Sequence, residues 1–347
     1  MAEFVVGTSA GEQADSALLR EAGFGWIRQG FPFPLAEGLG GRPSPQYAQA
    51  RAAAQAWIER GFRVMGITPL VGFEAVTFTD EGSTSAWQGR TPPWMGELTG
   101  EEFARNYQRV CAFLARDLQG MVPLWQIGNE WDAPAFSGPL GLRRACELVF
   151  HAARGLKEAD ASLTVGTNAA GISKSYYFHG RLYADPRGGD LDYCGVDQYF
   201  GSWQPGGPDT WDAHIWELAE ITGRPLLINE WGYASEGEVM DETEKELSLL
   251  HGAYYSGCRF RRWPFQWDEG HTPEVQAAYI RRALEVFGGH RERILGLLFY
   301  RWEDQQICWC GQADCPAQTR WGLVDPAGRP KPGFHAFREG IRQHFPG

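Results

Sequence analysis

The sequence predicts a single (β/α)8 (TIM) barrel that spans residues 1–347, and three observations support this fold class. Short apolar runs alternate with amphipathic helical patterns along the chain, which is typical of a parallel sheet with crossover helices. The apolar runs number eight. The length of 347 residues fits one elaborated barrel better than two domains, because this fold takes about 250 residues before insertions.

The expected strands are short apolar runs whose ends carry Gly, Pro or polar residues. In chain order they are Phe4–Gly7, Gly25–Arg28, Arg63–Thr68, Val122–Gly128, Leu163–Thr167, Tyr193–Tyr199, Pro225–Ile228 and Ile294–Tyr300. Helical patterns lie between them and after the last one. They include Ala14–Ala22, Tyr47–Arg60, Glu101–Leu118, Leu142–Ala159, Trp211–Thr222, Pro273–Val286 and Gly333–His344.

Two connections are much longer than the others: Pro69–Gly100 after the third strand, and Gly232–Thr272 after the seventh. Both are rich in aromatic residues. Long loops on one face of a rigid barrel are where substrate contacts concentrate. We therefore expect these two loops to form walls beside the functional site, and we take Trp267 as a candidate substrate contact.

Composition excludes several classes of function. The net charge of −11 argues against nucleic-acid binding, which needs clustered Lys and Arg. No apolar stretch is long enough to cross a bilayer, so we expect no membrane association. The chain enters a strand directly, without a basic and apolar leader, which favours the cytoplasm over export with a trimmed signal. We expect a monomer or a weakly associating homo-oligomer.

Two glutamates, Glu130 and Glu230, each lie in an Asn-Glu-Trp triplet that closes an apolar run. The runs are the fourth and seventh of the eight expected strands, and catalytic residues of (β/α)8 barrels lie at the carboxyl ends of strands. A single glutamate there could simply begin a helix. Two carboxylates that converge at one end of a barrel are what cleavage of a glycosidic bond requires.

The segments Gly128-Asn129-Glu130 and Ile228-Asn229-Glu230-Trp231-Gly232 resemble the fourth-strand and seventh-strand motifs of the retaining (β/α)8 glycoside hydrolases of clan A. That clan includes cellulase, mannanase, xylosidase and galactanase families. The resemblance implies that Glu130 is the acid/base, that Glu230 is the nucleophile, and that Asn129 contacts the sugar 2-hydroxyl group. It does not assign a family within the clan.

The same resemblance implies roles for two more residues. Arg28, at the end of the second strand, is expected to donate to the nucleophile carboxylate and keep it ionised. The alternative is an unrelated ion pair at the barrel rim. Tyr199, at the end of the sixth strand, is expected to hydrogen-bond the nucleophile. Asp197 stands where many clan members have histidine, which departs from the cellulase pattern.

Aromatic residues are abundant, at 14% of the chain with 15 Trp, and flat aromatic faces suit the apolar faces of sugar rings. Trp302, after the eighth strand, is expected by resemblance to form the floor beneath the sugar. Trp131 and Trp231 are further candidates because they follow the two glutamates, although the sequence does not show which way they face. For each of these rings, ordinary core packing is the alternative.

These observations predict a retaining O-glycoside hydrolase that acts on a β-linked glycan by double displacement, with a carbohydrate as its partner and no metal or other cofactor. An endo-acting groove is favoured, and an exo-acting enzyme with a pocket for one terminal sugar is the alternative. A glycan-binding barrel without catalysis is a third possibility. The Gly7–Gly11 segment matches a G-x-S-x-G nucleophile elbow, but only six residues precede it, too few for the sheet of that hydrolase class.

Three of the seven cysteines, Cys308, Cys310 and Cys315, form a C-x-C-x4-C cluster after the eighth strand. They could bind zinc with a fourth ligand from elsewhere. A Cys310–Cys315 disulfide and free thiols are the other possibilities. None of these states is needed for catalysis.

Overall fold

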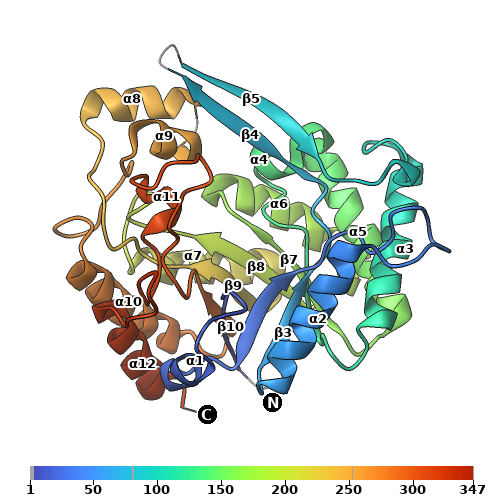
Figure 1. The fold of residues 1–347 in the computed structure, drawn as a ribbon, viewed down its shortest axis with the longest axis horizontal. Helices are drawn as coiled ribbons and strands as arrows, with labels where there is room; N and C mark the ends of the chain where they lie inside the picture. Colours follow the sequence, from blue (N-terminus) through green and yellow to red (C-terminus); the bar gives the residue numbers. More distant parts are fainter. Residues whose placement is uncertain (1–3, 80–81, 252, 347) are drawn as a thin grey trace.

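The computed structural model describes residues 4–79, 82–251 and 253–346. Within them, eight parallel strands close into a barrel in the order β1-β10-β9-β8-β7-β6-β3-β2, which confirms the predicted fold class (Figure 1). The strands are β1 Val5–Thr8, β2 Trp26–Gly30, β3 Arg63–Ile67, β6 Leu124–Ile127, β7 Thr164–Ala169, β8 Tyr193–Gln198, β9 Leu226–Trp231 and β10 Ile294–Phe299. Each of them overlaps a strand expected from the sequence.

Helices surround the barrel, and each barrel strand is followed by a helix that packs on its outside (Figure 1). They are α1 Ser16–Ala22, α2 Pro45–Glu59, α3 Glu101–Asp117, α5 Gly141–Ala159, α6 Ile172–Ala184, α7 Thr210–Thr222, α10 Pro273–Gly289 and α12 Pro332–His344. Asp15, Ser44 and Thr272 cap α1, α2 and α10 by accepting hydrogen bonds from backbone amides of the first turn. No helix in the described part of the chain has the length and apolar character needed to span a bilayer.

The core has two parts. A small cluster inside the barrel takes one large side chain from most strands: Val5, Trp26, Met65, Leu124, Tyr193, Leu227 and Leu298. A much larger cluster fills the space between the strands and the helices. Side chains alternate between the two faces of a strand. The residues two positions beyond the inner cluster therefore point into the barrel nearer its carboxyl end, where the polar residues described below lie.

The long loops after β3 and β9 contain secondary structure that the sequence analysis did not anticipate. After β3, the antiparallel hairpin of β4 Gly72–Thr79 and β5 Gly82–Gly89 projects beyond the barrel, at the top of Figure 1. After β9, the chain forms α8 Glu242–His251 and α9 Ala253–Phe260. Shorter helices are α4 Pro134–Ser137 and α11 Pro316–Thr319, together with the 3-10 turns η1 Pro93–Met95, η2 Gly138–Leu140 and η3 Pro186–Asp190.

Candidate active site

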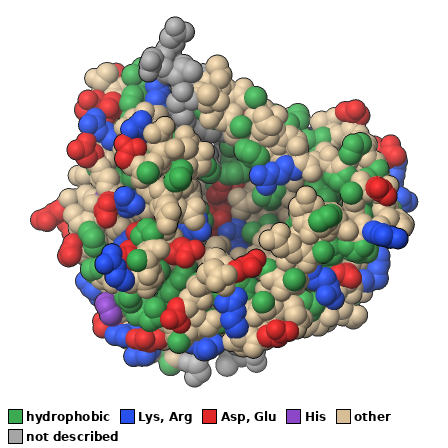
Figure 2. Space-filling view, viewed as in Figure 1, with side chains coloured by type: hydrophobic (Ala, Val, Ile, Leu, Met, Phe, Trp, Pro, Cys, Tyr) green, Lys and Arg blue, Asp and Glu red, His purple; other side chains and the backbone are tan. Residues whose placement is uncertain are grey.

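A pocket of about 430 Å³ opens at the carboxyl end of the barrel. In the space-filling view, this face is hollowed near its middle, and acidic side chains lie deep in the hollow (Figure 2). The lining residues come from the loops that follow β6, β7, β8 and β10, and from the end of β9. They are Asn129, Glu130, Asp132, Ala133, Ala135, Phe136, Ala170, Gly171, Tyr199, Trp203, Gln204, Glu230, Tyr300, Trp309, Gln318 and Trp321.

Glu130 lies in a tight turn directly after β6. Gly128 and Glu130 both have left-handed backbone conformations, with φ of 61° and 48°. Glycine is required at position 128, because a Cβ atom there would lie 2.4 Å from the ring of Trp131. The backbone N–H of Glu130 donates to Asn168 Oδ1 at 3.0 Å. A left-handed conformation is unfavourable for glutamate and is typical of functional sites.

Glu230 lies at the end of β9 beside an irregularity in the pairing with β8. The register changes so that Asp197 lies opposite Glu230, while Val196 pairs with Ile228. A bulge of this kind re-aims side chains. The two oxygen atoms of the Glu230 carboxylate are held separately: Arg28 Nη1 donates to Oε1, and the Tyr199 hydroxyl donates to Oε2.

Three carboxyl groups meet in the pocket. One oxygen atom from each of Glu130, Asp197 and Glu230 lies within 4.8 Å of the other two. All three residues are buried. A cluster of carboxylates is also a common cation site, but here the guanidinium group of Arg28 already supplies a positive charge against Glu230.

A polar network beneath the pocket holds these groups in place, and Gln126 is its centre. Gln126 Oε1 accepts from Arg28 Nε at 2.9 Å and from Asn229 Nδ2 at 2.7 Å. Asn129 Oδ1 accepts from Arg28 Nη2 at 2.8 Å and from the amides of Gln126 and Asn168, both at 3.1 Å. The Asn129 oxygen is therefore fully used by the protein, which leaves its Nδ2 group to donate to a ligand.

The pKa values of Glu130, Asp197 and Arg28 are all raised, for different reasons. The pKa of Glu130 is well above its ordinary value, because the carboxyl group is desolvated and faces the negative charges of Glu230 and Asp132. Desolvation and the same carboxylate of Glu230 raise the pKa of Asp197. Burial alone would lower the pKa of Arg28, but Glu230 and Asp197 outweigh it and raise the value, so the guanidinium stays charged.

The environment of Asp197 points to a proton shared with Glu130. Asn168 Nδ2 donates to Asp197 Oδ2, while no donor among the described residues reaches Asp197 Oδ1. A buried carboxylate oxygen without a donor is unfavourable. Asp197 and Glu130 hydrogen-bond each other, and this bond lowers the pKa of Glu130, so the donor is the protonated Asp197 carboxyl.

Asp132 connects two loops of the pocket wall. Its carboxylate oxygens accept hydrogen bonds from the backbone amides of Ala170 and Gly171 at 2.9 and 3.0 Å. The bonds tie the loop after β6 to the loop after β7. The charge of Asp132 also lies close enough to Glu130 to favour its protonated form.

Four tryptophans that the sequence offered as sugar contacts are not among the residues that line this pocket. Trp231 follows Glu230 directly in β9, and adjacent residues of a strand point to opposite faces. The Trp231 ring therefore faces out of the barrel and packs on Phe287 and Phe337 of the helix layer. The remaining three also pack against protein side chains. Trp131 lies against Tyr107, Trp302 lies between Phe24 and Phe334, and the half-buried Trp267 packs on Tyr233 and Tyr279.

Other aromatic residues line the pocket in their place. Tyr300, two positions before Trp302, is at the end of the eighth barrel strand and packs on Tyr199. Trp203, Trp309 and Trp321 complete the aromatic part of the wall. Alternation along β10 could have identified Tyr300, because Leu298 faces the barrel interior. The other three lie in loops, where no periodicity indicates a direction.

No protein-family model matches the chain, and no curated protein resembles it in sequence. Several solved structures resemble it in fold. A GH10 xylanase from Thermobacillus composti superposes with a TM-score of 0.63 at 17% identity, over 97% of both chains. A family 39 glycoside hydrolase from the gut symbiont Bacteroides cellulosilyticus WH2 has a TM-score of 0.62 at 15% identity, over 97% of this chain and 63% of that one.

An exo-β-1,4-mannosidase from Opitutaceae bacterium strain TAV5 has a TM-score of 0.64 at 15% identity, over 98% of this chain and 59% of that one. The chain thus spans less than two thirds of the mannosidase and of the family 39 enzyme. At such low identities the likeness establishes the fold. The chain is a (β/α)8 barrel of the kind found in these glycoside hydrolases.

Proposed function

We propose that this protein is a retaining O-glycoside hydrolase that acts on β-linked glycans. The observation that carries the proposal is the pairing of two glutamates in different environments. Their nearest oxygens lie within 4.8 Å. Retaining enzymes hold two carboxyl groups about 5–5.5 Å apart, whereas inverting enzymes leave about 6.5–9.5 Å for a water molecule.

Glu230 is the nucleophile in this proposal. Donors on both of its oxygens favour the ionised form and fix the direction of the carboxylate. Glu130 is the general acid, since its surroundings hold a proton at the start of the reaction. Glu230 attacks the anomeric carbon while Glu130 gives its proton to the departing oxygen, and a glycosyl-enzyme forms.

In the second step, the ionised Glu130 takes a proton from water, and the water oxygen attacks the anomeric carbon to release Glu230. Asn129 presents its free Nδ2 group to the sugar 2-hydroxyl in both steps. This role is supported by the three donors that already occupy Asn129 Oδ1. No cofactor takes part.

The shape around the pocket supports an extended substrate. A second cavity of about 450 Å³ lies between the β4–β5 hairpin and α4. Ala135, Phe136 and Trp309 line both cavities, so the two adjoin at these residues. We propose endo action on a β-glucan, mannan or xylan type of chain, with the second cavity taking further sugar units.

Chemical rescue tests the two catalytic roles. Glu230→Ala is expected to abolish turnover of aryl β-glycosides, and added azide should then give a glycosyl azide of inverted configuration. Glu130→Ala should still form the glycosyl-enzyme from substrates with good leaving groups, which need no protonation, and azide should give the retained product. Glu220→Ala, an exposed glutamate on α7, serves as the control and should leave turnover unchanged.

If the two variants give azides of the opposite configurations, Glu130 is the nucleophile and Glu230 is the acid/base. A panel of aryl β-glycosides with β-glucan, mannan, xylan and galactan tests the activity itself. If no product is released from any of these substrates, the protein is a glycan-binding barrel and not a hydrolase. The first products from a long oligosaccharide test the endo assignment, since monosaccharide alone at the earliest time would contradict it.

A further inference from the structure

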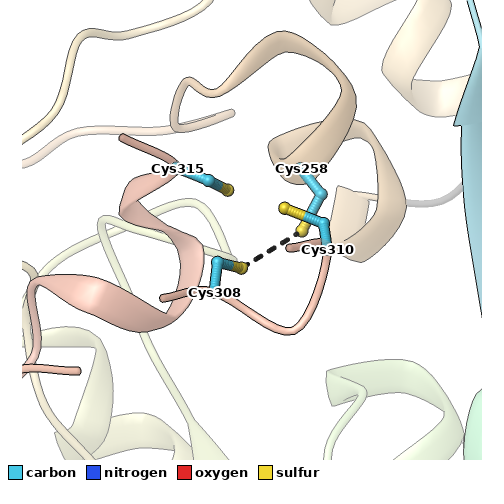
Figure 3. A group of neighbouring side chains, drawn as sticks. All are labelled: Cys258, Cys308, Cys310 and Cys315. Atoms are coloured by element: carbon cyan, nitrogen blue, oxygen red, sulfur yellow. Dashed lines mark hydrogen bonds between the residues drawn. The ribbon is translucent and has the colours of Figure 1, made fainter. Parts of the chain in front are cut away.

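A cluster of four cysteines lies beside the substrate pocket. Cys308, Cys310 and Cys315 come from the loop after β10, and Cys258 comes from α9 in the loop after β9. Their sulfur atoms all lie within 4.8 Å of one another, and the side chains point to a common centre (Figure 3). The sequence analysis left the fourth ligand open, because Cys258 is 50 residues before Cys308.

The spacing of the sulfur atoms fits a single tetrahedral ion. A Zn–S bond of about 2.3 Å in a tetrahedron separates two sulfur atoms by about 3.8 Å. Cys258 Sγ and Cys308 Sγ are 3.8 Å apart. A disulfide requires about 2.05 Å. All seven cysteines are unpaired in the structure, so the Cys310–Cys315 bond that the sequence allowed is not formed.

Hydrogen-bond donors surround the cluster. Each of the three sulfur atoms of the loop after β10 accepts a hydrogen bond from the backbone amide two residues further along the chain. The indole N–H of Trp309 donates to Cys258 Sγ at 2.9 Å. Metal-bound thiolates commonly have such outer hydrogen bonds, which orient them and disperse their charge.

We propose that Cys258, Cys308, Cys310 and Cys315 bind one structural zinc ion. Four thiolates complete the tetrahedron and leave no open position for substrate or water, so the ion takes no part in glycoside cleavage. Its role is mechanical. It joins α9 to the loop after β10, two segments that the sequence separates widely.

The position of the site connects it with the pocket. Trp309, between two of the ligands in sequence, lines both cavities and is 51% exposed. Trp203, another part of the pocket wall, packs against the cysteine cluster. The zinc ion thus holds the wall at the junction of the two cavities. This inference does not depend on the proposed function.

Metal analysis of the untagged protein, purified without chelators or added thiol-reactive agents, tests the proposal. Inductively coupled plasma mass spectrometry is expected to find about one zinc ion per chain. Replacement of zinc by Co²⁺ should give the visible absorption of a tetrahedral thiolate site. Cys308→Ser and Cys258→Ser should each lose the bound metal and lower Tm. Cys146→Ser, at a buried cysteine of α5 outside the cluster, should retain a full zinc content.

Several results would overturn the proposal. One is a protein that contains no metal although intact-mass analysis shows seven free thiols. A mass lower by about two hydrogens per disulfide would mean cross-linked cysteines. A coloured, iron-containing protein would assign the ligands to another metal. If the serine variants fail to fold, release of zinc from the wild-type protein by stepwise blocking of its thiols gives the same answer. Four modified thiols per zinc released are expected.

Discussion

Glu130 and Glu230 are the same residue type in the same triplet, and their neighbours alone make them different. Glu230 faces two donors, the Arg28 guanidinium and the Tyr199 hydroxyl. Glu130 is desolvated and faces the negative charges of Glu230 and Asp132. Positive charge and hydrogen-bond donors favour the ionised carboxylate, whereas desolvation and negative charge favour the protonated form. Except for Asp132, the residues that distinguish the two glutamates lie far from them in the sequence.

Asp132→Asn is expected to lower the pH above which activity is lost, because the charge of Asp132 raises the pKa of Glu130. The general acid works only while it is protonated, so kcat/KM falls as the pH rises through the pKa of Glu130. Removal of the nearby negative charge lowers that pKa, so the alkaline limb of the profile moves to lower pH. The pH dependence of kcat/KM for an aryl glycoside with a poor leaving group measures the shift.

Asp160→Asn is the matched control for this change, because Asp160 follows α5 at the opposite end of the barrel. Its profile should coincide with that of the wild-type protein. An unchanged alkaline limb in Asp132→Asn would mean that Asp132 does not influence the general acid.

The raised pKa of Glu130 also makes the stability of the fold depend on pH. The folded chain binds the Glu130 proton more tightly than the unfolded chain does. The free energy of unfolding therefore falls as the pH rises from the ordinary glutamate pKa to the raised one.

At the scale of elements, the turn after β6 is the most constrained piece of backbone in the pocket. Gly128→Ala places a methyl group 2.4 Å from the Trp131 ring, in a residue with φ of 61°. A left-handed alanine costs about 1–2 kcal/mol, and overpacking adds about 1–3 kcal/mol. We therefore expect the free energy of unfolding, measured by chemical denaturation, to fall by about 2–5 kcal/mol.

Gly25→Ala provides the comparison, because a Cβ atom at position 25 meets no heavy atom within 4 Å. Its unfolding free energy should change by no more than about 1 kcal/mol. Equal losses in the two variants would mean that the turn is not tightly packed. Gly128→Ala should also reduce activity more than stability explains, since the turn positions Glu130.

The sequence predicted the barrel strands well and the loops poorly, for a physical reason. A strand buried on both faces is a short apolar run, so eight such runs sufficed to predict the barrel. The β4–β5 hairpin lies outside the barrel, and its second strand begins Gly-Ser-Thr-Ser, so its sequence resembles an irregular loop. In α6, Tyr176, Tyr177 and Phe178 are consecutive, which obscures the helical period.

Side-chain direction separates the site residues that could be predicted from those that could not. The barrel itself brings four of the site residues together, because each lies in a barrel strand or follows one: Arg28, Glu130, Tyr199 and Glu230. The directions of Trp131 and Trp302 depend on turns beyond the strand ends. Gln126 could have been found, because strand alternation places it in the barrel together with Leu124.

At the scale of the whole molecule, the two adjoining cavities predict that substrate length matters. Phe73→Ala removes an aromatic face from the second cavity, at a distance from the glutamates along the hairpin. We expect KM for a long oligosaccharide to rise about two- to tenfold, from the loss of one aromatic contact. KM for an aryl monoglycoside, which occupies only the first cavity, should not change.

Trp216→Ala is the control, since Trp216 is an exposed aromatic residue on α7. It should affect neither substrate. Equal increases in KM for the long and the short substrate after Phe73→Ala would argue against an extended groove. They would favour a single closed pocket instead.

The closure of the barrel has a consequence for synthesis on the ribosome. β1 pairs with β10, and Val5 lies opposite Gly296. β2 pairs with one edge of β1, but the other edge has no partner until the ribosome has made β10, about 290 residues later. At about 5–20 residues per second, this takes on the order of 15–60 seconds. During that time the backbone amides and carbonyls of one edge of β1 are unpaired, and such an edge can join the strands of other nascent chains. The last barrel strand thus ends the period in which this protein is most prone to aggregate.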